Sequence, residues 1–107
     1  MTTFKEYQDA AAKVPISLRN DRERIELPIL GLREETGKLD KLLSAGFASG
    51  KFHLTPAQSS EVKDRLADVL WCIARLCEES GLSMENVATH SCMQIQTRVK
   101  GLDPERR

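Results

Sequence analysis

The stretch TPAQSSEVKDRLADVLWCIARLCEESG, residues 55–81, predicts a helix with a clear beginning and a clear end. Thr55, Pro56 and Gln58 match an N-cap, a first-turn proline and a capping-box partner, and Gly81 is a stop signal. Apolar residues recur between them at helical spacings of three, four and seven, and we expect this stripe to face the core: Val62, Leu66, Val69, Leu70, Ile73, Leu76 and Cys77. A neighbouring stripe is mostly charged: Glu61, Arg65, Asp68, Cys72 and Arg75.

Two helices are expected before this one. Thr2 or Thr3 can cap a short helix that ends by Pro15, and Glu6 supplies the capping-box partner of Thr3. A polar connector should fill residues 15–24. The second helix is expected from Glu26 to Gly46, because Pro28 is tolerated in a first turn but not later in a straight helix.

One more helix is expected afterwards, capped by Ser83 and ending before Gly101 and Pro104. Its thin apolar face consists of Val87, Cys92, Ile95 and Val99. The fold class is therefore all-α: a single domain over 1–107 with four helices, and a frayed tail over 102–107. Because one helix is short and the last stripe is thin, we expect a homo-oligomer to complete the helical bundle.

Composition excludes several classes of protein. The 107 residues are 40% hydrophobic and 5% aromatic, which suits an aliphatic helical bundle, and 16 basic and 16 acidic side chains cancel. A net charge of zero gives no long-range attraction to nucleic acid or to an anionic membrane, so neither is an expected partner. The three cysteines lack a Cys-x-x-Cys pair, and charges interrupt every apolar run, so we expect buried free thiols and a cytoplasmic protein.

One acidic residue lies where a core residue is expected. In the second helix, Glu35 falls on the apolar stripe formed by Ile29, Leu32, Leu39, Leu42 and Leu43. A buried carboxylate must be protonated, paired with a cation or bound to a metal. Helical spacing allows ion pairs of Lys38 with Glu34 or Glu35, and of Arg65 with Glu61 or Asp68. It also allows a carboxylate cluster for Mg²⁺ or Mn²⁺, made by Glu34, Glu35, Glu61, Asp64 and Asp68.

The side chain of Trp71 could stack on a nucleobase or pack against protein. We assign no role to His53 or His90.

Four segments resemble the MazG-like nucleotide pyrophosphohydrolases. They are FKEYQDAA at 4–11, GLREETGKL at 31–39, LADVLW at 66–71 and GLSMENVA at 81–88. The resemblance implies an all-α fold that assembles with itself as a dimer or tetramer. It also implies hydrolysis of a nucleoside triphosphate, with or without the 2′-hydroxyl, to the monophosphate and pyrophosphate, with Mg²⁺ or Mn²⁺ as cofactor and water as nucleophile.

By this resemblance, Glu35 and Asp68 match the first and last metal ligands, and Glu34 an acidic neighbour. Lys38 and Arg65, in contrast, replace the two ligands in between, so Asp64 becomes a candidate shifted ligand. The phosphate-facing positions of the fourth helix are Ser91 and Gln94 here, followed by Arg98 as a possible phosphate contact. Lys38, Arg65, Trp71, Gln94 and Arg98 are therefore the predicted substrate-binding residues.

Three functional interpretations follow. The first is an active hydrolase with a rearranged metal site made of Glu34, Glu35, Asp64 and Asp68. The second is a pseudoenzyme, a nucleotide-binding or regulatory homo-oligomer in which Lys38 and Arg65 replace the metal. The third is a purely structural helical dimer with an internal ion-pair network. Repulsion between a cation and a metal at about 4 Å argues against an unchanged metal site.

Overall fold

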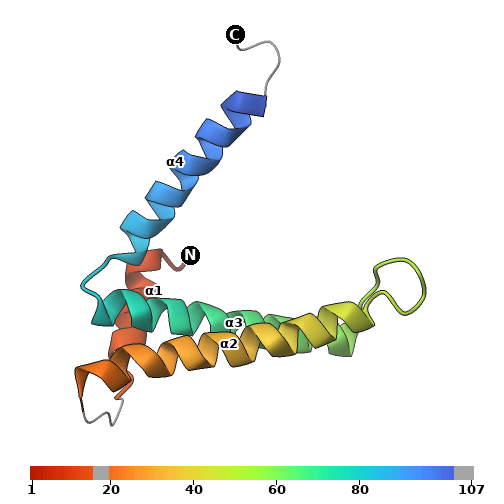
Figure 1. The fold of residues 1–107 in the computed structure, drawn as a ribbon, viewed down its shortest axis with the longest axis horizontal. Helices are drawn as coiled ribbons and strands as arrows, with labels where there is room; N and C mark the ends of the chain where they lie inside the picture. The colour runs from red at the N-terminus through yellow and green to blue at the C-terminus, as the bar shows by residue number, and fades with distance from the viewer. Residues whose placement is uncertain (16–19, 103–107) are drawn as a thin grey trace.

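The described part of the chain is all-helical. The computed structural model describes residues 1–15 and 20–102, and these contain four helices and no strand (Figure 1). The helices are α1 (Phe4–Ala12), α2 (Asp21–Ala45), α3 (Pro56–Glu79) and α4 (Met84–Leu102). The predicted fold class and number of helices are thereby confirmed. The frayed tail was predicted over 102–107. Leu102 is the last residue of α4, and residues 103–107 lie outside the described residues.

Capping side chains set the starts of three helices as predicted. At α1, the Glu6 N–H donates to Thr3 Oγ1 at 3.0 Å, and the Thr3 N–H donates to Glu6 Oε1 at 3.3 Å. The same reciprocal pair joins Thr55 and Gln58 at the start of α3. At α4, the Asn86 N–H donates to Ser83 Oγ at 3.2 Å. Polar side chains thus satisfy backbone donors that a helix start leaves without partners.

The predicted start of α2 was wrong. The helix begins at Asp21 rather than Glu26, because Asn20 is an effective N-cap whose side chain accepts a hydrogen bond from the Glu23 N–H at 2.9 Å. Pro28 therefore lies inside the helix, where it is buried. Of the expected connector over 15–24, residues 16–19 lie outside the described residues, and 21–24 are helical. The end at Gly46 was predicted correctly.

The helices α2 and α3 form an antiparallel hairpin, and α1 crosses it near one end (Figure 1). The core is small. Four buried residues, Ala11, Ala74, Cys77 and Met84, form its centre, with Tyr7, Leu70 and Trp71 packed against them. Gly81 turns the chain into α4 with a φ of 69°, a left-handed value that favours glycine.

The predicted core stripe of α3 is partly wrong. Leu66 is 53% exposed and Ile73 is 36% exposed, whereas Cys72 and Arg75 of the neighbouring stripe are buried. The cause is the position of the two neighbouring helices, since α2 approaches α3 at Cys72 and α1 approaches it at Arg75. The side of α3 that carries Leu66 and Ile73 is consequently covered only in part by the described residues.

A buried arginine holds α1 in place. Arg75 donates from Nη1 to the Ala11 carbonyl oxygen at 3.3 Å and from Nη2 to Glu79 Oε1 at 2.6 Å. Gln8 adds a second tie, because its side chain donates to the Leu82 carbonyl at 2.8 Å and accepts from the Met84 N–H at 2.8 Å. These contacts join α1 to the turn between α3 and α4. No described helix combines the length and the apolar character that crossing a membrane demands.

Candidate functional site

Glu35 lies on the face of α2 that packs against α3. Its side chain is only 13% exposed, as expected for a residue on the apolar stripe. One turn earlier, Gly31 brings the two helices together: a Cβ at this position would lie 3.1 Å from Cys72 Sγ. A side chain at Gly31 would require Cys72 Sγ to move by a few tenths of an ångström, so its absence allows the close contact that brings Glu35 against α3.

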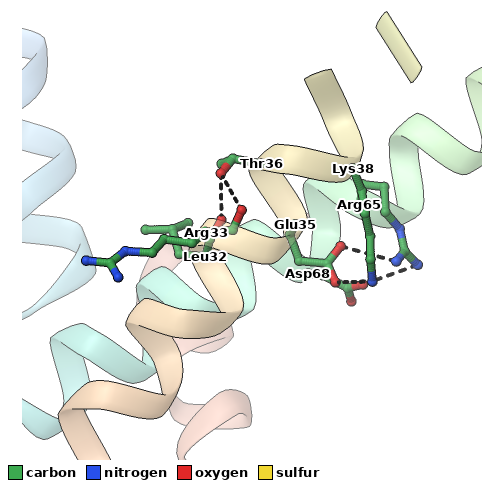
Figure 2. A network of polar contacts seen from close by, with 7 residues as sticks. All are labelled: Leu32, Arg33, Glu35, Thr36, Lys38, Arg65 and Asp68. Atoms are coloured by element: carbon green, nitrogen blue, oxygen red, sulfur yellow. Dashed lines mark hydrogen bonds and ion pairs between the residues drawn. The ribbon is translucent and has the colours of Figure 1, made fainter. Parts of the chain in front are cut away.

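Two cations surround the Glu35 carboxylate (Figure 2). Lys38 Nζ lies 3.4 Å from Oε1, and Arg65 Nη1 reaches across from α3 to within 3.2 Å of Oε2. Arg65 also uses Nη2 to contact Asp68 Oδ2 at 3.4 Å. The predicted pairs of Lys38 with Glu35 and of Arg65 with Asp68 are confirmed. The contact between Arg65 and Glu35 joins the two helices.

This network leaves part of its hydrogen-bonding capacity unused. Glu35 Oε2 is close to Arg65 but accepts no hydrogen bond of good geometry from any described residue, and buried Arg65 Nε has no acceptor among them. Buried polar groups usually find partners, because leaving one unsatisfied costs about 1–3 kcal/mol. Arg65 and Glu35 are therefore not arranged as an optimised structural ion pair.

Burial and the nearby carboxylates keep the Cys72 thiol protonated. Burial raises the pKa of Cys72, and the negative charges of Glu35 and Asp68 raise it further. Burial also raises the pKa of Tyr7 on α1, with smaller contributions from Asp68 and Cys72. Cys72 and Tyr7 are therefore neutral near pH 7, and neither can serve as an anionic nucleophile or ligand there.

Other predicted site residues lie apart from Glu35. Glu34 and Asp64 are exposed, and Trp71 is half-buried against the core formed by α1, α3 and Met84. Gln94 and Arg98 are exposed on α4, which diverges from the α2–α3 hairpin (Figure 1). Of the predicted substrate-binding residues, only Lys38 and Arg65 therefore lie beside the same group, the Glu35 carboxylate, within one chain.

The residues around Glu35 do not fit a divalent metal. Within residues 1–15 and 20–102, no three carboxylate, thiol or imidazole side chains form a group that could hold a metal ion. The donors around Glu35 are instead an ammonium and a guanidinium, and each repels a cation. This arrangement neutralises Glu35 without a metal.

Two residues of the site were not singled out by the sequence. Gly31 and Cys72 form the close helix contact that precedes Glu35. A glycine inside a helical pattern is a signal of close packing. Cys72 belongs to the same stripe as Arg65 and Asp68, but its burial depends on the rotation of α3 against α2.

Comparisons with protein-family models, with curated proteins and with solved structures find no match to this chain.

Proposed function

We propose that this chain is a MazG-like nucleotide-binding module in which Arg65 and Lys38 take the place of the family's metal and in which hydrolysis has been lost. The observation that carries the proposal is the position of Arg65, 3.2 Å from Glu35 and 3.4 Å from Asp68. These two carboxylates are the ones that match metal ligands in the family. A guanidinium between them supplies the positive charge that a metal supplies to phosphates.

The solvent-exposed parts of Arg65 and Lys38 support a ligand beside the ion pairs. The Arg65 side chain is 26% exposed and that of Lys38 is 52% exposed, so a phosphate can accept hydrogen bonds from the Arg65 guanidinium and from Lys38 Nζ. The ligand is therefore expected to be a nucleoside phosphate bound through its phosphates. A panel of nucleotides would identify the base and the sugar that the site prefers.

Metal-dependent hydrolysis is the second candidate function. Lys38 and Asp68 are both about half exposed, and their ion pairs are long, at 3.4 Å. Such pairs contribute little free energy, so Mg²⁺ or Mn²⁺ arriving with a nucleotide could displace them. Glu35 and Asp68 would then be its candidate ligands, and the exposed Glu34 and Asp64 would have to turn toward them to complete the set.

Thermal stability and pyrophosphate release, measured together, separate these functions. The full chain is heated with a panel of ribonucleoside and deoxyribonucleoside triphosphates, either with a chelator or with Mg²⁺ or Mn²⁺. We expect nucleotide to stabilise the protein even with the chelator, by about 2.7 kcal/mol at 100 times Kd, without release of pyrophosphate. Arg65→Met should lose this stabilisation, whereas Arg24→Met, an exposed arginine near the start of α2, should keep it.

Other outcomes contradict the proposal. Metal-dependent release of pyrophosphate would establish the second candidate. If no nucleotide stabilises the protein, the ion pairs have only a structural role.

A further inference from the structure

The loop that joins α2 to α3 holds two phenylalanine rings side by side. We call this loop, residues 46–54, the hairpin tip. The ring centroids of Phe47 and Phe52 lie 5.0 Å apart, with their planes tilted by 51°. The two residues are nevertheless 59% and 50% exposed. Two of the three phenylalanines of the chain thus meet at one exposed place, and an exposed cluster of large apolar side chains is typical of an interaction site.

Contacts within the hairpin tip keep these rings in place. Gly46 is buried, and a Cβ at this position would lie 2.8 Å from Phe52 Cε1, so Phe52 packs where the chain has no side chain. The Gly46 carbonyl oxygen accepts a hydrogen bond from the His53 N–H at 2.8 Å, which closes the loop. Gly50 has a φ of 89°, a left-handed value that favours glycine. The two rings are therefore exposed in a defined loop conformation.

The same end of the hairpin has an excess of positive charge. Residues 41–60 include Lys41 and Lys51 but no acidic side chain, although the chain has 16. Both lysines are exposed, and neither forms an ion pair with any residue that the structure describes. The net charge of zero therefore coexists with a local imbalance, because the acids that balance these lysines lie elsewhere on the chain.

The hairpin holds its tip away from the rest of the molecule. The helices α2 and α3 have 25 and 24 residues, and helices of that length are about 36 Å long. In Figure 1 the tip lies at the end of the hairpin opposite to α1 and α4, along the longest dimension of the molecule, 50 Å. The tip can therefore touch a flat surface without bringing α1 or α4 against it.

We propose that the hairpin tip docks on an anionic lipid surface, with Phe47 and Phe52 at the boundary between headgroups and acyl chains and with Lys41 and Lys51 beside the headgroups. Phenylalanine is among the side chains that bury at this boundary, and each lysine close to an anionic leaflet strengthens binding. A protruding tip suits a fluid surface that adapts to its shape, whereas a protein partner would need a matching pocket.

This contact is local, so it differs from the long-range attraction that the net charge argues against. Two lysines act on headgroups only within about one Debye length, 8–10 Å at physiological ionic strength. Binding should be weak and reversible, of the order of the association constant of a single myristoyl chain, about 10⁴ M⁻¹. The proposal does not depend on nucleotide binding at Arg65.

Co-sedimentation of the full chain with lipid vesicles tests this surface. Wild type should bind vesicles made of equal parts of phosphatidylserine and phosphatidylcholine, and should bind phosphatidylcholine alone much less. Phe47→Ser should lower the association constant about 10-fold, and Lys51→Glu about 10-fold or more. Phe4→Ser, at a residue that is 46% exposed on α1, and Lys63→Glu, at an exposed lysine of α3, make the same changes away from the tip and should bind as wild type does.

A fluorescent variant shows whether the ring enters the lipid. Phe47→Trp keeps an aromatic side chain at the tip, so it should bind as wild type does. Its emission should shift to shorter wavelength when anionic vesicles are added. Trp71 packs against the core, so wild type should show no such shift. Far-UV circular dichroism should be the same for wild type and all variants, because the substituted positions are exposed.

Three outcomes would overturn the proposal. A wild-type protein that binds neither kind of vesicle would exclude a lipid surface, and an acidic protein surface would then be the alternative partner. Equal binding to both kinds of vesicle would show that the lysines do not recognise anionic headgroups. An equal loss of binding in Phe4→Ser and Phe47→Ser would show that binding does not occur through the hairpin tip.

Discussion

At the scale of single residues, the defining feature is a carboxylate that is neutralised inside a helix contact. Glu35 has lost most of its water, and its charge is compensated by Arg65 from the facing helix and by Lys38 from its own. The cost of removing charged groups from water is offset only partly, because Arg65 Nε has no acceptor among the described residues. With an ammonium and a guanidinium beside it, the Glu35 carboxylate is poorly suited to hold a divalent cation.

Replacing this carboxylate by its neutral counterpart tests the network. Glu35→Gln keeps the shape of the side chain but leaves Lys38 and Arg65 with less compensation. We expect the free energy of unfolding to fall by about 1–2 kcal/mol, less than for a fully buried pair because Arg65 and Lys38 reach solvent. Urea denaturation is the measurement. Glu34→Gln removes the same charge from the exposed neighbouring position and should change stability by less than about 0.5 kcal/mol. Equal effects of the two variants would show that the Glu35 pairs contribute nothing to stability.

The sequence predicts only part of this site. Pairs within one helix follow from spacing, so the contacts of Lys38 with Glu35 and of Arg65 with Asp68 were predictable. The contact between Arg65 and Glu35 was not, because it depends on how α3 is rotated against α2. The same rotation buries Cys72 and exposes Leu66, against the expectation from the apolar pattern.

At the scale of helices, capping residues explain where the elements begin. Thr3, Thr55 and Ser83 were recognisable because their side chains accept hydrogen bonds from backbone donors three residues later. The start of α2 was not recognised, because Pro28 is a familiar first-turn residue and Asn20 is also a familiar turn residue. The N-cap of Asn20, together with acidic Asp21 and Glu23 in the first turn, outweighs the proline.

Arg75 holds α1 in place. We therefore expect its buried ion pair to stabilise the protein more than an exposed pair of the same spacing does. Arg75 is 7% exposed and pairs with Glu79 four residues on, while Arg22 is 85% exposed and pairs with Glu26 at the same spacing. We expect Arg75→Met to lower the free energy of unfolding by about 3 kcal/mol, because it strands Glu79 and the Ala11 carbonyl. Arg22→Met should change the free energy of unfolding little, because solvent screens this exposed pair. Chemical denaturation gives both values, and a similar small cost for the two variants would contradict this role of Arg75.

At the scale of the whole molecule, one chain has a small core of its own. Its buried apolar residues are mostly small, and none of the described large side chains is fully buried. The sequence predicted this deficit from the short first helix and the thin stripe of the last one. It did not predict that part of the α3 stripe would join the exposed surface, because that depends on where α1 and α2 pack.

The homodimer that the sequence leads us to expect should make thermal stability depend on protein concentration. A tenfold rise in concentration adds about 1.4 kcal/mol per mole of dimer. With the usual entropy of unfolding for two chains of 107 residues, this should raise Tm by about 3 °C. Circular dichroism over two decades of concentration measures this shift. A wild-type Tm that does not move would contradict assembly coupled to folding.

The thin attachment of α4 also bears on how long an unassembled chain survives in a cell. A helix held only at its first turns opens readily, and an opened apolar segment is a preferred place for proteases to cleave. Anything that covers the exposed part of α4 would spare the chain from cleavage there. The lifetime of the protein would in this way depend on how much of the time that helix is covered.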